Sequence, residues 1–262
     1  MLKGIYVLPS VITSANLAAG FLSIIFSINS QFTPAAWAII AAMALDIMDG
    51  RVARWTKSTS QFGIELDSLS DMVSFGVAPS VMMYQMVLNQ MQKPGIMIAV
   101  FFVIAGALRL ARFNVKAKDG ESSSDFLGLP IPAAAGILAS FVLSYELFEM
   151  GSEINVKTIP VLMKRMPFFF KSIPITMIII SILMISNIPY LGFKRYKFDR
   201  PKSLQILVLV VLSILLVVAY PQNTIFIIFL LYLISGIAIY FWRYWRLRSQ
   251  MKSLEKTVKK DD

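Results

Sequence analysis

The sequence contains no cysteine and no histidine among its 262 residues. The first absence excludes disulfide bonds and thiolate chemistry, and the second excludes imidazole bases and the commonest zinc and haem ligands. Any acid or base must therefore be a carboxylate, a lysine, a tyrosine or water. Charge is scarce too: 15% of residues are charged and 57% are hydrophobic, which leaves too little polar surface for a soluble domain. This composition predicts an integral membrane protein.

Hydropathy predicts an all-α fold, a polytopic bundle of membrane-spanning helices. A helix needs about 20 mostly apolar residues to cross a bilayer, and eight segments of the chain meet this requirement. The first is interpreted as a span rather than a signal peptide, because its N-terminal flank carries only Lys3 and no small-residue cleavage site precedes a soluble domain. The eight expected spans are roughly 10–29, 34–56, 67–89, 95–114, 130–149, 172–190, 204–220 and 224–244.

The basic residues are distributed unevenly between the two sides of the expected bundle. The chain has 25 Lys and Arg against 15 Asp and Glu, and eight spans place twenty of these 25 on the side of both termini. Because basic loops are retained in the cytoplasm, we expect the termini and the segment 46–71 on the cytoplasmic side. Contact with anionic lipid headgroups explains the net positive charge, and no aromatic or folded motif indicates a nucleic-acid partner.

Four aspartates are concentrated where the second expected span ends and the third begins. Asp46 and Asp49 are three residues apart, and Asp67 and Asp71 are four apart, so each pair lies on one face of its helix. Two antiparallel neighbouring helices would bring both faces into one volume. Solvated helix-end charges are the alternative, which the helix dipole favours for Asp67 at an N-terminus and disfavours for Asp46 at a C-terminal end. Clustered carboxylates repel one another unless cations bridge them, and all-oxygen ligands favour Mg²⁺ or Mn²⁺, with Ca²⁺ a further option.

Two glycines and one arginine accompany these acids. Gly50 and Gly63 remove side chains where a ligand could approach the backbone, although close helix packing would also explain them. Arg54 lies one helical turn after Gly50 and would suit a phosphate, although a positive-inside anchor is the simpler interpretation. Asn16, near one end of the first expected span, is a candidate to bind a nucleotide or phosphate, or to form a buried hydrogen bond between helices.

The spacing D-x2-D-G-x2-A-R-x8-G-x3-D-x3-D, from Asp46 to Asp71, resembles without gaps the signature of the CDP-alcohol phosphatidyltransferases. The resemblance implies a membrane enzyme, a phosphotransferase for substituted phosphate groups, that displaces CMP from CDP-diacylglycerol with an alcohol. It implies a six-helix catalytic membrane domain at 1–190, followed by an additional two-span region at 191–244 and a basic cytoplasmic tail at 245–262. It also implies that the enzyme forms a homodimer and that membrane lipids are among its partners.

The resemblance assigns roles to individual residues of the signature. Asp46, Asp49 and Asp67 are expected to bind one of two divalent ions. Asp71 is expected to help bind the second ion and to accept the proton of the incoming hydroxyl as the catalytic base. The expected nucleotide and diphosphate pocket comprises Asp46, Asp49, Gly50, Ala53, Arg54, Ser60 and Gly63 from this stretch, and Asn16, which is a candidate by its position in the first expected span and not by the signature.

Stretches outside the signature resemble the phosphatidylserine synthase branch of that family, which implies L-serine as the acceptor. Arg109, Arg112 and Asn114, at the end of the fourth expected span, are candidates to bind the serine carboxylate, or else are positive-inside anchors. Glycerol 3-phosphate and inositol phosphate are alternative acceptors, whose phosphate dianion demands a more basic pocket. A cation transporter is a distant alternative, which would place acids at the bilayer midplane within inverted repeats. The four stretches are LPSVITSANLAAGF (8–21), DSLSDMVSFGVAPS (67–80), ALRLARFNV (107–115) and GLPIPAAAG (128–136).

Overall fold

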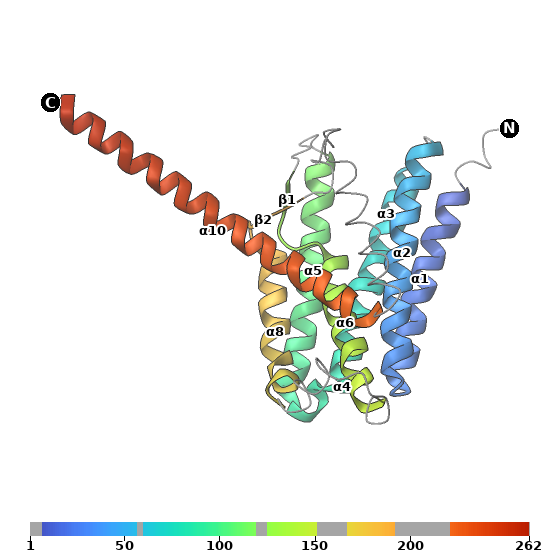
Figure 1. The fold of residues 1–262 in the computed structure, drawn as a ribbon. Coiled ribbons are helices and arrows are strands. Elements are labelled where there is room, and N and C mark those ends of the chain that lie inside the picture. Colours follow the sequence, from blue (N-terminus) through green and yellow to red (C-terminus); the bar gives the residue numbers. More distant parts are fainter. Residues whose placement is uncertain (1–6, 57–59, 119–124, 151–166, 192–220, 262) are drawn as a thin grey trace, which may run out of the picture.

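The described residues of the computed structural model, 7–56, 60–118, 125–150, 167–191 and 221–261, form a bundle of helices (Figure 1). The helices are α1 (Val7–Ile28), α2 (Phe32–Thr56), α3 (Gln61–Asp71), α4 (Ala78–Met86), α5 (Lys93–Lys118), α6 (Ile131–Met150), α8 (Pro167–Ile185) and α10 (Pro221–Asp261). A π-helical segment, η1 (Met72–Val77), joins α3 directly to α4, and a short 3-10 turn, η2 (Leu88–Met91), precedes α5.

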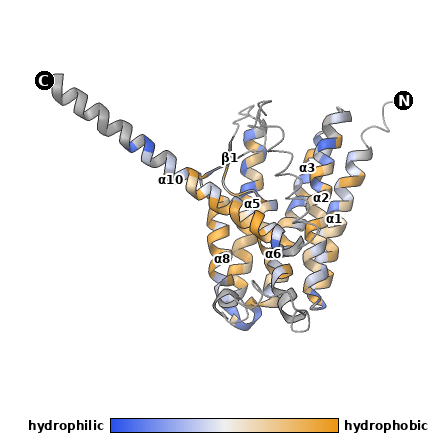
Figure 2. Ribbon diagram, viewed as in Figure 1, coloured by the Kyte–Doolittle hydropathy of each residue, from blue (hydrophilic) through white to orange (hydrophobic). Residues whose placement is uncertain are grey.

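Apolar residues dominate the helices of the bundle (Figure 2). Four helical stretches among the described residues are long and apolar enough to cross a membrane, and two shorter ones are apolar as well. The chain is therefore a helical membrane protein, as its composition predicted. The expected span 204–220 lies outside the described residues, so the count of eight spans stays a prediction. The four long stretches are Pro9–Ile28, Phe32–Val52, Lys93–Lys116 and Asn223–Trp242, and the two shorter ones are Ile131–Ser144 and Ser172–Ile185.

Helix α6 lies in the interior of the bundle, where it contacts α2, η1 and α10. Ala134, Ala135 and Ala139 of α6 are fully buried, as are Ala35 and Ala36 of α2. Small side chains let helix backbones approach closely, which is how membrane helices gain packing contacts without a hydrophobic driving force between them. The alanine-rich sequence of α6 therefore explains its interior position.

Helix α1 packs closely against η1. A Cβ atom at Gly20 would lie only 2.6 Å from the Cα atom of Ser74, so this contact requires glycine. Two serine hydroxyls hydrogen-bond α1 along the same face: Ser74 donates to the carbonyl of Asn16 at 3.0 Å, and Ser70 donates to the carbonyl of Thr13 at 3.1 Å. These contacts fix α1 beside the end of α3.

One small element departs from the expected all-α fold. The strand β1 (Asp125–Leu127) pairs antiparallel with β2 (Pro189–Leu191), with Phe126 opposite Tyr190. The sixth expected span, 172–190, is therefore too long, because α8 ends at Ile185 and extended backbone follows. Proline disfavours helical geometry at the residue before it, so Pro189 explains why the helix cannot continue to that point.

Helix α10 crosses the side of the bundle and then extends beyond it to the C-terminal end (Figure 1). It has 41 residues, and a helix of that length spans about 60 Å at a rise of about 1.5 Å per residue. The helix thus continues past the expected span 224–244 into the basic tail. It contacts α6 and β2 within the bundle.

Candidate functional site

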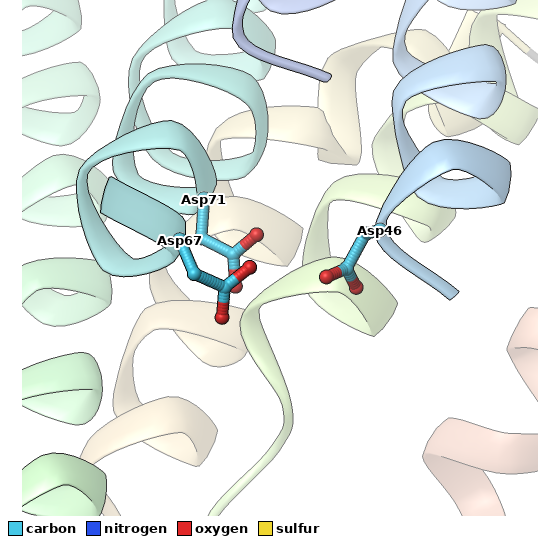
Figure 3. Close-up of side chains that lie close together, drawn as sticks. All are labelled: Asp46, Asp67 and Asp71. Carbon is cyan, nitrogen blue, oxygen red and sulfur yellow. The ribbon is translucent and has the colours of Figure 1, made fainter. Parts of the chain in front are cut away.

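Three of the four signature aspartates gather at one place between α2 and α3. Asp67 and Asp71 of α3 face Asp46 of α2 (Figure 3). One carboxylate oxygen from each of these three residues lies within 4.8 Å of those of the other two. Asp49 lies close enough for its charge to interact with Asp46 and Asp67. The spacing argument from the sequence therefore predicted the convergence of the two helix faces.

The local sequence explains how α3 presents its two acids. Ser60 is the N-cap residue of α3, and its hydroxyl accepts a hydrogen bond of 3.0 Å from the backbone N–H of Gly63. Asp67 and Asp71 follow on one face of the helix because they are four residues apart. The π-helical segment η1 begins immediately after Asp71. Such segments are rare and occur frequently at functional sites, and the sequence did not predict this one.

Helix α1 supplies polar partners to the acids from a third direction. The hydroxyl of Thr13 donates a hydrogen bond to Asp49 Oδ2, and Thr13 is 2% exposed. Asn16 is fully buried, and its amide nitrogen lies 3.5 Å from Asp71 Oδ1. Thr13 was absent from the residues predicted from sequence. The one signal was its three-residue spacing from Asn16, which places both side chains on one face of α1.

The donor set of this site fits a divalent cation. Asn16 Oδ1 and Asp49 Oδ1 are buried and have no hydrogen-bond partner among the described residues. Buried oxygen atoms without a partner are costly, whereas carboxylate and amide oxygens are the ligands that Mg²⁺, Mn²⁺ and Ca²⁺ prefer. Three clustered carboxylates would also repel one another without a cation. The structure thus combines a cluster of anionic oxygens with unpartnered oxygens directly beside it.

Apart from Asn16 on α1, the residues expected to bind the nucleotide and diphosphate lie on α2 and at the start of α3. Within the part of the chain that the structure describes, a Cβ atom at Gly50 would have no neighbour within 4 Å, so the described residues leave the space in front of this backbone open. At Gly63 a Cβ atom would meet Ser60 Oγ, at 3.2 Å. Ala53 and Arg54 belong to α2, but their side chains lie outside the described residues. Their roles therefore stay predictions.

The two arginines of α5 have different surroundings although they are three residues apart. Arg109 is 9% exposed and lies close enough to Asp71 and Asp46 for their charges to interact. Arg112 instead donates hydrogen bonds to the carbonyls of Ile185 and Ser186, at 3.2 and 3.4 Å, and to the side chain of Asn187. These bonds join α5 to the end of α8.

Asn114, the third residue expected to bind the acceptor, lies on the α3 side of α5. Its amide donates a hydrogen bond of 2.9 Å to the hydroxyl of Ser68. Ser68 adjoins Asp67 in the sequence, so Asn114 contacts the acidic helix beside the acids rather than the acids themselves. Of the three residues expected to bind the acceptor, only Arg109 lies beside the carboxylates of Asp46 and Asp71.

Comparison with known proteins agrees with this geometry. The family model described as CDP-alcohol phosphatidyltransferase matches residues 6–180. The chain is 37% identical over 236 residues to a CDP-diacylglycerol–serine O-phosphatidyltransferase of Helicobacter pylori, covering 89% of this chain and 90% of that protein. It is 32% identical over 239 residues to a protein of the same name from Methanocaldococcus jannaschii, covering 91% and 96%. It is also 36% identical over 185 residues to an archaetidylserine synthase of Methanothermobacter thermautotrophicus, covering 70% and 69%.

Proposed function

This chain belongs to the CDP-alcohol phosphatidyltransferase family and is a transferase of that class, and from that premise we propose that it is a phosphatidylserine synthase. In the proposed reaction, the hydroxyl of L-serine attacks the phosphorus that carries the diacylglycerol group of CDP-diacylglycerol. The bond from that phosphorus to the bridging oxygen breaks, CMP leaves, and the serine hydroxyl loses its proton.

The observation that carries this proposal is the convergence of Asp46, Asp67 and Asp71 from two helices, at the acidic positions of the family signature. Their oxygens, together with those of Asp49, are suited to hold two divalent ions, Mg²⁺ or Mn²⁺. Bound there, such ions would neutralise the charge of the diphosphate and stabilise the departing CMP. The names of the related proteins favour serine as the acceptor.

Asp71 is the proposed base. It is 9% exposed and lies at the end of α3 beside both Asp46 and Arg109. The amide of Asn16, 3.5 Å from Asp71 Oδ1, would hold this carboxylate in place while its other oxygen faces the hydroxyl to be deprotonated. With no histidine in the chain, a carboxylate is the natural choice for this proton transfer.

The pocket for the nucleotide and diphosphate is proposed to begin at Gly50, where the backbone is open to an approaching group. Asn16, Ala53, Arg54, Ser60 and Gly63 complete the proposed set. Of these, Ser60 and Gly63 are already joined by the N-cap hydrogen bond of α3. The N-terminal turn of a helix favours anionic phosphate groups through its free N–H groups and its dipole, which suits this part of the site to the diphosphate.

The acceptor is proposed to bind beside Arg109. Among the described side chains, Arg109 is the one guanidinium beside the acids, and one guanidinium matches the single carboxylate of serine. Glycerol 3-phosphate or inositol phosphate would bring a dianion, and the second arginine that could balance it, Arg112, is hydrogen-bonded to the end of α8. Placement of the site at the cytoplasmic face and assembly into a homodimer belong to the same proposal.

The purified protein in lipid nanodiscs, incubated with CDP-diacylglycerol, Mn²⁺ and radiolabelled serine, tests the proposal. We expect labelled lipid and an equal amount of CMP, and loss of both on addition of a chelator. Parallel reactions contain glycerol 3-phosphate or inositol phosphate as the acceptor, and an ether-linked CDP-lipid as the donor. Label from another acceptor but none from serine would refute the acceptor assignment, whereas CMP release that ignores the chelator would refute the role of the aspartates.

A further inference from the structure

Helix α3 must hold one rotation about its own axis for its two carboxylates to face Asp46. Asp67 and Asp71 both point toward α2 in this arrangement (Figure 3). At about 3.6 residues per turn, Ser68 and Ser70 lie on the two opposite flanks of the helix face that carries these acids. Contacts at both serines would therefore resist a turn of α3 in either direction.

Each of the two flanks is hydrogen-bonded to a different helix. On one flank, the buried hydroxyl of Ser70 donates to the carbonyl of Thr13 in α1, at 3.1 Å. On the other flank, the hydroxyl of Ser68 accepts a hydrogen bond of 2.9 Å from the side-chain amide of Asn114 in α5. The Ser68 hydroxyl in turn donates to the carbonyl of Ile64, at 3.0 Å, which leaves its lone pairs to accept from the amide.

Helix α5 is a firm support for the second of these contacts. It has 26 residues and packs against η1, α4 and α8, and Arg112 bonds it to the carbonyls of Ile185 and Ser186 at the end of α8. The π-helical segment η1 begins directly after Asp71. Because a π-helix closes its turns with i→i+5 bonds, the regular α-helical register of α3 ends there. Side-chain contacts of α3 itself therefore bear on the direction of its acids.

We propose that the hydrogen bond between Asn114 and Ser68 fixes the rotation of α3 that presents its two acids to a divalent cation. Asn114 is then a positioning residue rather than a ligand of the acceptor. The inference rests on the proposed function, because it takes the acids as the metal site. Without this bond, α3 keeps its contact at Ser70 alone and can turn about it. Part of the free energy of metal binding is then spent on returning Asp67 and Asp71 to the cation.

Ser68→Ala and Asn114→Ala in the full-length protein remove the two sides of this bond. We expect each to raise the dissociation constant for Mn²⁺, measured by isothermal titration calorimetry, by about two- to tenfold, the range for one hydrogen bond between neutral groups. The double variant should bind Mn²⁺ no more weakly than either single variant, because the same bond is lost only once. Ser68→Thr keeps the hydroxyl and should bind Mn²⁺ as the wild type does.

Matched controls remove similar hydrogen bonds in other elements. Asn89→Ala, in η2, removes an amide bond of 3.0 Å to the carbonyl of Gln85. Ser181→Ala, in α8, removes a hydroxyl bond of 2.7 Å to the carbonyl of Met177, four residues earlier, a bond of the kind that Ser68 also makes. Both controls should keep the wild-type affinity for Mn²⁺. A melting temperature for each variant identifies loss of folding, and either side of the bond is a sufficient test if the other variant does not fold.

Kinetics separate positioning of the acids from direct binding of the acceptor. In Asn114→Ala, the Mn²⁺ concentration for half-maximal activity should rise, whereas the serine KM at saturating Mn²⁺ should stay at the wild-type value. A serine KM that rises in Asn114→Ala but not in Ser68→Ala would show that Asn114 binds the acceptor. That result would overturn the inference, as would an equal loss of Mn²⁺ affinity in the control variants or additive losses in the double variant.

The proposed function and this inference fail in different ways. If the wild-type protein binds no Mn²⁺, the proposed metal site is wrong and the inference falls with it. If the wild type binds Mn²⁺ and neither Ser68→Ala nor Asn114→Ala changes the affinity, the proposed function stands and the inference alone fails. If an alcohol other than serine is the acceptor, the Mn²⁺ titration still decides the inference, because it contains no acceptor.

Discussion

Thr13→Val tests how α1 supports the acidic site. The side chain of Thr13 is buried, and its hydroxyl lies within hydrogen-bonding distance of both Asp49 Oδ2 and the carbonyl of Pro9. Valine has nearly the same shape, so the substitution removes the hydroxyl and leaves the packing of α1 largely intact. Asp49 Oδ1 already has no partner among the residues that the structure describes. The variant therefore leaves both oxygens of a buried carboxylate without a hydrogen bond from these residues.

The size of the effect follows from that change. A hydrogen bond to a charged group contributes about 1.5–3 kcal/mol, and about 1.4 kcal/mol corresponds to a factor of about ten in an equilibrium constant. Losing the hydrogen-bond partner of a metal-binding side chain typically weakens metal binding by about 10–100-fold. This range agrees with the factor that follows from the hydrogen-bond energy. We expect the dissociation constant for Mn²⁺ to rise by about 10–100-fold in Thr13→Val. Thr13→Ser keeps the hydroxyl and should restore most of the affinity.

Electron paramagnetic resonance of free Mn²⁺ during a titration of the purified protein measures this affinity without any assay of activity. The control is Thr176→Val in α8. The hydroxyl of Thr176 donates a hydrogen bond of 3.0 Å to the carbonyl of Ser172, four residues earlier, as the hydroxyl of Thr13 can to the carbonyl of Pro9. An unchanged Mn²⁺ affinity in Thr13→Val would show that Asp49 does not depend on α1. An equal loss in Thr176→Val would show that the effect is a general loss of helix stability.

Four further substitutions probe the base, the packing of α1, the open position at Gly50 and the contact of α5 with α8. Asp71→Asn should still bind CDP-diacylglycerol but release no CMP in a single-turnover assay, and turnover near the wild-type rate would rule out Asp71 as the base. Gly20→Ala should lower the free energy of unfolding by about 1–3 kcal/mol because the new methyl group meets the backbone of Ser74. Gly50→Ala, at an open position, should keep the melting temperature of the wild type and lower the activity. Equal melting temperatures for the two variants would contradict the close packing of α1. Arg112→Gln should lower the melting temperature because it removes hydrogen bonds to the end of α8, and a selective rise in the serine KM would instead show that Arg112 binds the acceptor.

The acid cluster was predictable from the sequence because it depends on local spacing. Residues three or four apart lie on one helix face, and a short connection makes two successive helices neighbours, so the sequence predicted that the acids could converge, and Asp46, Asp67 and Asp71 do. The family signature added the roles. The same reasoning did not predict that Asp49 would hydrogen-bond to Thr13, because the angle at which α1 meets α2 is a property of tertiary packing.

The different environments of the two arginines could not be read from the sequence either. Arg109 and Arg112 share a helix face by their spacing, but α8, whose end accepts the hydrogen bonds of Arg112, comes from much later in the chain. The π-helical segment after Asp71 was also missed, since periodicity assumes a regular α-helix throughout.

Anomalous X-ray scattering at the manganese edge, from crystals grown with Mn²⁺, shows whether the four aspartates bind divalent ions. We expect anomalous peaks bounded by Asp46, Asp49, Asp67 and Asp71, and their loss in Asp67→Asn crystals grown in the same way. A well-ordered site with no peak among these side chains, or peaks bound elsewhere in the bundle, would contradict this expectation.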